Sequence, residues 1–157
     1  MTLRTRARTM DRRTMIAGGG AMLLSPLLAQ PVWATDEELA TAVRVATGGA
    51  EVKAGRVKLT MPELAENGNA VALTVSVDSP MTAADHVKAI HIFGPENPLV
   101  TLARFHLGPR SGRAKVSTTV RLANSQKVLA VAHMSDGSFW SGDAYVLVTL
   151  AACIDGG

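Results

Sequence analysis

The sequence predicts an all-β protein, an immunoglobulin-like antiparallel β-sandwich preceded by one short helix. From about residue 51 onward, apolar residues recur at every second position in short runs, which is the period of half-buried strands. Glycines and prolines typical of turns separate these runs at sandwich spacing. The length agrees with this, because the 123 residues after residue 34 (157 − 34) suit one domain with a single core.

Residues 1–34 have the features of a signal peptide. The pair Arg12-Arg13, followed by Thr14-Met15-Ile16, indicates a bacterial twin-arginine signal. An uncharged, mostly apolar stretch follows, and Val32-Trp33-Ala34 offers a small-residue cleavage site, with Val32 and Ala34 at the outer positions. The apolar stretch is short and interrupted by glycines and Pro26, so no stable membrane insertion is expected. The sequence therefore predicts export to the periplasm by the twin-arginine route.

Removal of this segment changes the charge of the protein. The full chain has 16 basic and 13 acidic residues, a net charge of +3. The first 34 residues hold five arginines and Asp11, which leaves 11 basic and 12 acidic residues in the remainder. A near-neutral exported chain, with no block of like charge apparent along its sequence, gives no argument for nucleic-acid binding.

Residues 35–50 are predicted to form the one helix. Thr35 and Glu38 have capping-box spacing, and acidic residues fill the first turn. A narrow apolar stripe follows at helical spacing, and Gly48-Gly49 ends the helix. One amphipathic helix cannot bury its stripe alone, so we expect it to pack on the domain or on a partner.

Residues 51–151 are predicted to form the sandwich, from seven short strands. The alternation is clearest at 71–77 and 114–122, whereas 127–134 is apolar on both faces, which suggests a tight heterodimer. Asp136-Gly137 marks a turn. Phe139 and Trp140, beside it, are interpreted as core anchors rather than as a recognition patch. The expected strands lie at 57–59, 71–77, 87–93, 100–107, 114–122, 127–134 and 143–151.

Few residues of the sandwich suggest chemistry. The four histidines, His86, His91, His106 and His133, lack paired zinc-ligand spacing and are interpreted as unrelated surface or edge residues. Asp85, His86 and Lys88 are interpreted as a turn and a solvated face. The sequence shows no phosphate-binding loop and no nucleophile elbow. No catalytic residue, metal site or cofactor is predicted.

The single cysteine, Cys153, is the most informative residue. An odd cysteine in an exported protein is buried and inert, paired with another molecule, or a working thiol. Here it lies in a tail of small residues that ends in Gly156-Gly157, where little fixes the backbone. We therefore predict a flexible C-terminal arm, residues 152–157, that presents the thiol. About six residues span roughly 20 Å when extended.

Several stretches resemble one protein family in the same order along the chain. The segment from Met61 to Val71, Met-Pro-Glu-Leu-Ala-Glu-Asn-Gly-Asn-Ala-Val, resembles that of SoxY, the sulfur carrier of the bacterial Sox thiosulfate-oxidation system. The stretches 77–82, 87–93 and 134–140 are similar to it as well. The resemblance covers nearly all of the chain after residue 34 and ends at the cysteine.

This resemblance implies a non-enzymatic, periplasmic carrier. Cys153 would hold the sulfur compound covalently, and a SoxZ-like β-sandwich subunit would form a heterodimer with the chain. The implied transient partners are a SoxAX-type cytochrome that loads thiosulfate, a SoxB-type hydrolase that releases sulfate, and a sulfane dehydrogenase.

The arm departs from the Gly-Gly-Cys-Gly-Gly tail usual in the family. Ala151 and Ala152 precede the cysteine, and Ile154 and Asp155 separate it from Gly156-Gly157. This arm is stiffer and bulkier, and the carboxylate disfavours a neighbouring thiolate. Two alternatives stay open: a paralogue that carries another sulfur compound, and a periplasmic immunoglobulin-like binding module with an idle cysteine.

Overall fold

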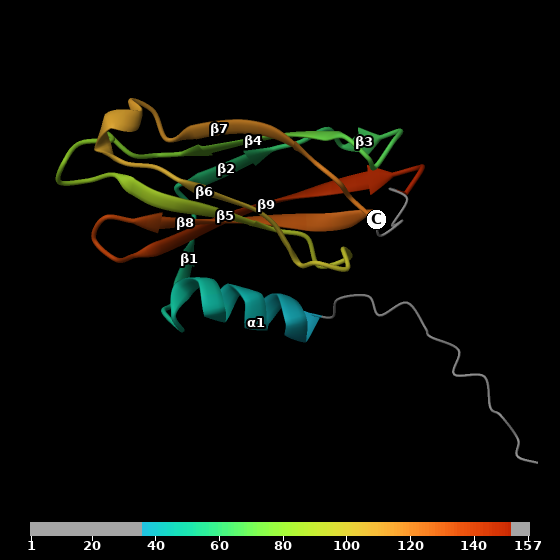
Figure 1. Ribbon diagram of the computed structural model, residues 1–157, viewed down its shortest axis with the longest axis horizontal. Coiled ribbons are helices and arrows are strands. Elements are labelled where there is room, and N and C mark those ends of the chain that lie inside the picture. Colours follow the sequence, from blue (N-terminus) through green and yellow to red (C-terminus); the bar gives the residue numbers. More distant parts are fainter. Residues whose placement is uncertain (1–35, 152–157) are drawn as a thin grey trace, which may run out of the picture. The chain divides into compact units, whose positions relative to one another are not determined.

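The structure, a computed structural model, describes residues 36–151, which all belong to one compact unit. Two sheets stack face to face, and a single α-helix lies on the outside of the larger sheet (Figure 1). The predicted class, a β-sandwich with a short N-terminal helix, is confirmed.

Helix α1 (Asp36–Thr47) begins with three acidic residues, which suit the positive end of the helix dipole. It ends where predicted, because Gly48 and Gly49 adopt positive φ angles of 64° and 85° and the Gly49 N–H donates to the Arg44 carbonyl at 2.9 Å. The predicted cap, Thr35, lies outside the described residues. The apolar stripe of the helix packs against the domain's own sheet. This was one of the two expected arrangements, the other being packing on a partner.

The larger sheet has the strand order β1-β9-β8-β5-β6, with β3 paired to the far end of β9. The pairs β5–β6, β5–β8 and β8–β9 are antiparallel, whereas β1 and β3 both pair with β9 in parallel. Its strands are β1 (Val52–Ala54), β3 (Leu64–Ala65), β5 (Val87–Phe93), β6 (Thr101–His106), β8 (Gln126–Met134) and β9 (Phe139–Val148).

The smaller sheet is antiparallel with the order β2-β4-β7. Its strands are β2 (Val57–Thr60), β4 (Val71–Val77) and β7 (Lys115–Val120), and a short 3-10 helix, η1 (Pro109–Ser111), lies between β6 and β7. The described residues thus form nine strands rather than the predicted seven. The two extra strands, β1 and β3, are too short to show a period in the sequence.

The core lies between the sheets and is aliphatic. Val75, Val87, Ile90, Ile92 and Val128 are fully buried there. A second, smaller cluster lies under the helix, where Phe93, Val131 and Phe139 contact the apolar stripe of α1.

The strand β8 is therefore covered on both faces by its own chain. Val128 and Ala130 face the sandwich core, while Leu129 and Val131 contact the helix cluster. This arrangement explains the doubly apolar segment that had suggested a heterodimer. The helix, and not a partner subunit, covers that face.

The strand β9 begins earlier than the sequence predicted, at Phe139 instead of residue 143. Asp136-Gly137 makes the predicted turn, with φ of 86° at Gly137. Because this turn is tight, Phe139 and Trp140 already pair with β8, and Phe139 is buried. The interpretation of these aromatic residues as core anchors is confirmed for Phe139, and Trp140 packs against the edge of the main core.

Candidate functional site

The predicted site residues lie almost entirely outside the described part of the chain. This is the case for Cys153, for the rest of the arm (residues 152–157), and equally for the two signal arginines, Arg12 and Arg13. Of the flexible residues predicted around the cysteine, the structure describes Ala151 alone. Ala151 is the last described residue and is exposed. What the structure does describe is the segment from Val148 to Ala151, which we call the root of the arm because Cys153 follows it directly.

The root is held by the segment that carried the family resemblance. The N–H of Leu147 donates to the Glu63 carbonyl at 2.9 Å, and that of Thr149 donates to the Ala65 carbonyl at 3.0 Å. The Thr149 hydroxyl adds a third bond, to the Glu66 carbonyl at 3.1 Å. The short parallel strand β3 exists because of these bonds. The Pro-Glu-Leu-Ala-Glu-Asn-Gly motif thus fixes where the arm leaves the sandwich.

Among the described residues, Gly68 makes the contact closest to the cysteine in sequence. Its N–H donates to the carbonyl of Leu150 at 2.8 Å, three positions before Cys153. Its own carbonyl accepts from the N–H of Leu122 at 2.8 Å. Gly68 is buried and therefore ties the root to the chain that follows β7. Figure 1 shows the described chain ending at the same end of the sandwich as β3.

Ser125 holds the other side of the root. Its hydroxyl accepts from the N–H of Val148 at 2.8 Å and lies 3.3 Å from the Val148 carbonyl. A serine side chain thereby takes the place of a neighbouring strand at the end of β9. No sequence pattern pointed to Ser125, because its partner lies 23 positions away.

A buried polar network supports the loop that contains Ser125. The Asn97 side chain accepts from the Gln126 amide at 2.7 Å and from the Ala123 N–H at 3.2 Å, and it donates to the Arg121 carbonyl at 2.8 Å. Gln126 in turn accepts from the Glu96 N–H at 3.1 Å. Both amide side chains are buried and fully paired, so the loop is rigidly placed.

The structure corrects the interpretation of the four histidines as unrelated surface or edge residues for His91, whereas His106 is exposed on the edge strand β6. His91 is only 5% exposed, and it shares the helix-covered sheet with His106 and His133. Ala89 pairs with His106 on one side and His133 on the other, so these two histidines flank one position of β5, two residues before His91. The strand order that brings them together is not visible in the sequence.

Burial and nearby positive charge lower the pKa of His91 below 6.5. Desolvation is the main cause, followed by Arg104, His106 and His133. The Arg104 Nε–H donates to His91 Nδ1 at 3.2 Å, which requires that this nitrogen carry no proton. Desolvation likewise lowers the pKa of His133, with Lys88 adding to the effect and Asp136 opposing it.

The other candidates have structural roles. Asp85 pairs with Arg56 at 3.3 Å, and the His86 ring bonds to the Thr82 carbonyl at 3.1 Å, as expected for a turn. The pKa of Asp136 is lowered mainly by hydrogen bonds from Ser138 in the β8–β9 turn. Among residues 36–151, no group of three or more His, Cys, Asp or Glu side chains could hold a metal ion. The same residues contain no helix long and apolar enough to cross a membrane.

Comparison with known proteins first defines the class of fold. Superoxide reductase (neelaredoxin) from Ignicoccus hospitalis is similar in structure, with a TM-score of 0.52, 22% identity, and coverage of 60% of this chain and 80% of that one. Superoxide reductase from Nanoarchaeum equitans has a TM-score of 0.52 at 13% identity and covers 61% of this chain and 100% of its own. At such low identity these similarities show a shared sandwich fold.

The family is more specific. The family model described as sulfur oxidation protein SoxY matches residues 39–153. The sulfur carrier protein SoxY from Chlorobium limicola f. thiosulfatophilum is similar in structure, with a TM-score of 0.63, 26% identity, and coverage of 74% of this chain and 100% of that one. None of the curated protein sequences is a match for this chain. The chain belongs to the SoxY family.

Proposed function

We propose that this protein is a periplasmic carrier that holds thiosulfate-derived sulfur covalently on Cys153 while partner enzymes act on it. The observation that carries the proposal is the family match, which extends to residue 153. The similarity to a SoxY described as a sulfur carrier supports it. The twin-arginine signal proposed for residues 1–34 supplies the periplasmic location.

The chemistry proposed for Cys153 is reversible sulfur–sulfur bonding. Oxidative coupling of the thiolate to thiosulfate forms an S–S bond and a cysteine S-thiosulfonate, and releases two electrons to a c-type cytochrome of a partner. Water then cleaves the terminal S–S bond, so that sulfate and a proton leave and a persulfide remains on the cysteine. The carrier itself supplies position, and the partner enzymes supply catalysis.

The rigid root supports this division of labour. Bonds from Gly68, Ser125 and the β3 segment fix the chain as far as Leu150. The reach of the thiol is therefore set by the few residues between Leu150 and Cys153, at about 3.3 Å per residue. The proposed SoxZ-like subunit and the SoxAX-type, SoxB-type and sulfane dehydrogenase partners are carried over from the family.

The residues around Cys153 favour one second candidate. Ile154 and Asp155 replace the glycines expected there, and a carboxylate beside the thiol repels an anion such as thiosulfate. A carrier for a different, less anionic sulfur compound fits these residues.

Intact-mass spectrometry tests both candidates. The protein is purified without reductant from cells that oxidise thiosulfate and is measured before and after reduction. We expect a reducible adduct on Cys153, whose mass identifies the cargo, and no adduct on the Cys153→Ser variant, which should keep the fold. A thiosulfate-derived mass supports the first candidate, and another sulfur mass supports the second. An adduct that persists in Cys153→Ser, or a bare thiol in the parent protein, would contradict the carrier function.

A further inference from the structure

The strand β7 leaves one edge of the smaller sheet open. Within residues 36–151 it pairs only with β4, through six consecutive residue pairs without a register shift. The neighbouring edge strand of the other sheet, β6, has an irregularity opposite Ile92 and Phe93. Irregularities of this kind protect sheet edges from further pairing, and β7 has none. Strand β7 is therefore the edge better suited to receive another strand.

A groove runs beside this open edge. It lies between β6 and β7, which are not hydrogen-bonded to each other, and has a volume of about 480 Å³. Half-buried apolar side chains of β6, Leu102 and Phe105, form one wall, and Thr118 and Val120 of β7 form the other. Because side chains alternate between the faces of a strand, every second residue of a strand added to β7 would enter this groove.

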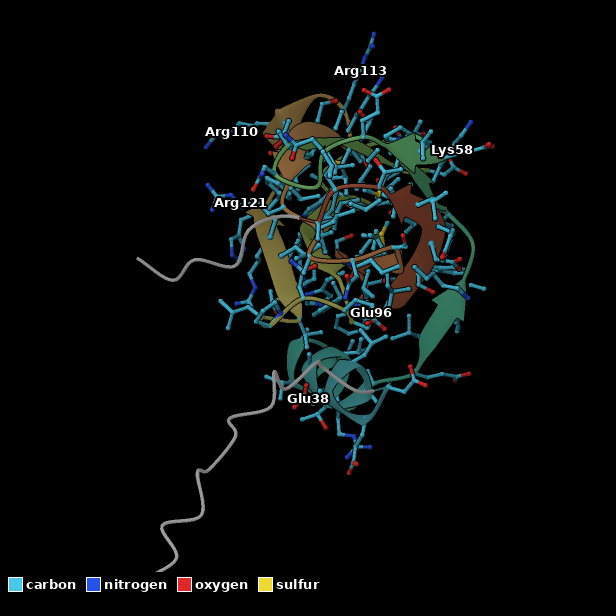
Figure 2. All side chains as sticks on the ribbon, turned by 90° about the vertical axis from the view of Figure 1, so that its right-hand side faces the viewer. Glu38, Lys58, Glu96, Arg110, Arg113 and Arg121 are labelled. Carbon is cyan, nitrogen blue, oxygen red and sulfur yellow. The ribbon has the colours of Figure 1, made fainter. Side chains whose placement is uncertain are left out.

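The open edge is also basic. Residues 97–135 contain six basic residues and no acidic one, namely Arg104, Arg110, Arg113, Lys115, Arg121 and Lys127. Lys115 begins β7 and Arg121 directly follows it, and both are exposed; Arg110 and Arg113 lie in the connection that leads into the strand. Figure 2 shows Arg110 and Arg121 on one side of the sandwich and Lys58 on the opposite side. Such a surface favours an acidic occupant.

The charges argue against a second copy of this chain as the occupant. Antiparallel pairing of two β7 strands centred on Thr118 would place Lys115 of each copy opposite Arg121 of the other. Like charges directly opposite each other destabilise a strand pair.

We propose that β7 receives an extended segment of a partner protein in which acidic and apolar residues alternate. The acidic side chains lie on the outer face, level with Lys115, Ser117 and Arg121. The apolar side chains fill the groove and cover Leu102 and Phe105.

The groove lies close to the root of the arm. Arg121 immediately precedes Leu122, which is bonded to Gly68, and Gly68 is bonded to Leu150. Two hydrogen bonds thus connect the end of β7 to the root. A partner seated on β7 therefore lies near the root of the arm, and its use in delivering Cys153 to that partner rests on the proposed carrier function.

The test uses a synthetic probe and the Cys153→Ser variant, so that sulfur loading does not affect the result. Binding of a fluorescent acetyl-Glu-Val-Glu-Val-Glu-Val peptide is measured by anisotropy, with a Lys-Val peptide of equal length as comparison. Amide hydrogen exchange then locates the contact. We expect the acidic peptide to bind, the Lys-Val peptide not to bind, and exchange to slow in β7, whose amides pair with the peptide, but not in β2 at the opposite edge of the same sheet.

Two double variants decide whether the charge of the edge matters. Lys115→Gln with Arg121→Gln should weaken peptide binding about tenfold, since two exposed ion pairs are lost. The matched control is Arg44→Gln with Lys58→Gln, which also removes two positive charges, but from residues outside β7. It should change peptide binding by less than about twofold. Equal weakening in both variants, exchange that slows in β2 and not in β7, no peptide binding, or tighter binding to phosphatidylglycerol vesicles would overturn the proposal. Failure of the carrier function would leave these binding results unchanged.

Discussion

His91 is buried although a histidine in water is half-charged near pH 6.5. Its ring lies 6.2 Å from that of Phe93, nearly parallel to it, and Arg104 donates to Nδ1. The folded protein therefore stabilises the neutral form with the proton on Nε2. Protonation would place a second positive charge beside Arg104 and remove the acceptor of this hydrogen bond.

The lowered pKa of His91 predicts that the protein loses stability in mild acid. The folded state holds fewer protons than the unfolded state, so the contribution of His91 is full above pH 6.5 and is lost as pH falls through the lower, folded pKa. His133 acts in the same direction. Urea unfolding at pH 7.5, 6.5 and 5.5 should show the free energy of unfolding decreasing with pH.

Two variants test whether His91 causes this loss. His91→Gln removes the titrating group, so the decrease between pH 7.5 and 5.5 should become smaller. Arg104→Met removes a nearby positive charge, so the pKa of His91 should rise and the decrease should again become smaller. A decrease of the same size as in the parent protein, in both variants, would contradict the assignment.

At the scale of elements, strand β9 serves both as a core strand and as the support of the arm. Its first half pairs on both sides, with β8 and with β1. Towards its end one neighbour is replaced by the two-residue strand β3 and the other by the hydroxyl of Ser125. The end of β9 therefore depends on a few specific bonds, each of which can be removed by one substitution.

We predict that Ser125→Ala loosens the root of the arm. The Val148 N–H loses its acceptor, at a cost of about 1 kcal/mol. Amide hydrogen exchange of Val148 and Thr149 should become about fivefold faster. This factor follows because about 1 kcal/mol less is then needed for the local opening through which these amides exchange.

Ser117→Ala is the control for this prediction. Ser117 bonds to the Thr74 hydroxyl at 2.9 Å in the smaller sheet and is exposed. Its removal should leave exchange at Val148 and Thr149 unchanged. If both variants accelerate exchange at the root equally, Ser125 has no specific role there.

At the scale of the whole molecule, the two sheets come into close backbone contact where β9 passes β2. Gly142 lies against the backbone of Val57, and a Cβ atom at this position would overlap the Val57 carbonyl oxygen. Only glycine permits this approach between the two strands.

Gly142→Ala is therefore expected to destabilise the fold. A methyl group here must push the two strands apart, at a cost of about 1 to 3 kcal/mol in the free energy of unfolding. Gly108→Ala is the matched control, because Gly108 has extended backbone (φ −155°) and no atom near its Cβ position. Urea unfolding of both variants tests the prediction, and equal stabilities would contradict it.

The elements that have a clear period or a clear turn could be predicted from the amino-acid sequence alone. The alternation of Val71, Leu73 and Val75 predicted β4, and Gly48-Gly49 predicted the end of α1, because local sterics and burial act over a few residues. The sequence also predicted the SoxY family through ordered motifs. The role of the Cys153 thiol as the attachment point for sulfur was predicted from the composition of the tail and from this resemblance. This role stays a prediction, because Cys153 lies outside the described residues.

The tertiary structure decided which distant residues meet. The pairing of Thr149 with Glu66 spans 83 positions, and that of Ser125 with Val148 spans 23, so no local pattern could indicate the root of the arm. Strand order also gathered three histidines on one sheet and placed Lys115 and Arg121 on an open edge. Spacing along the chain does not encode these arrangements, because they depend on which strand packs beside which.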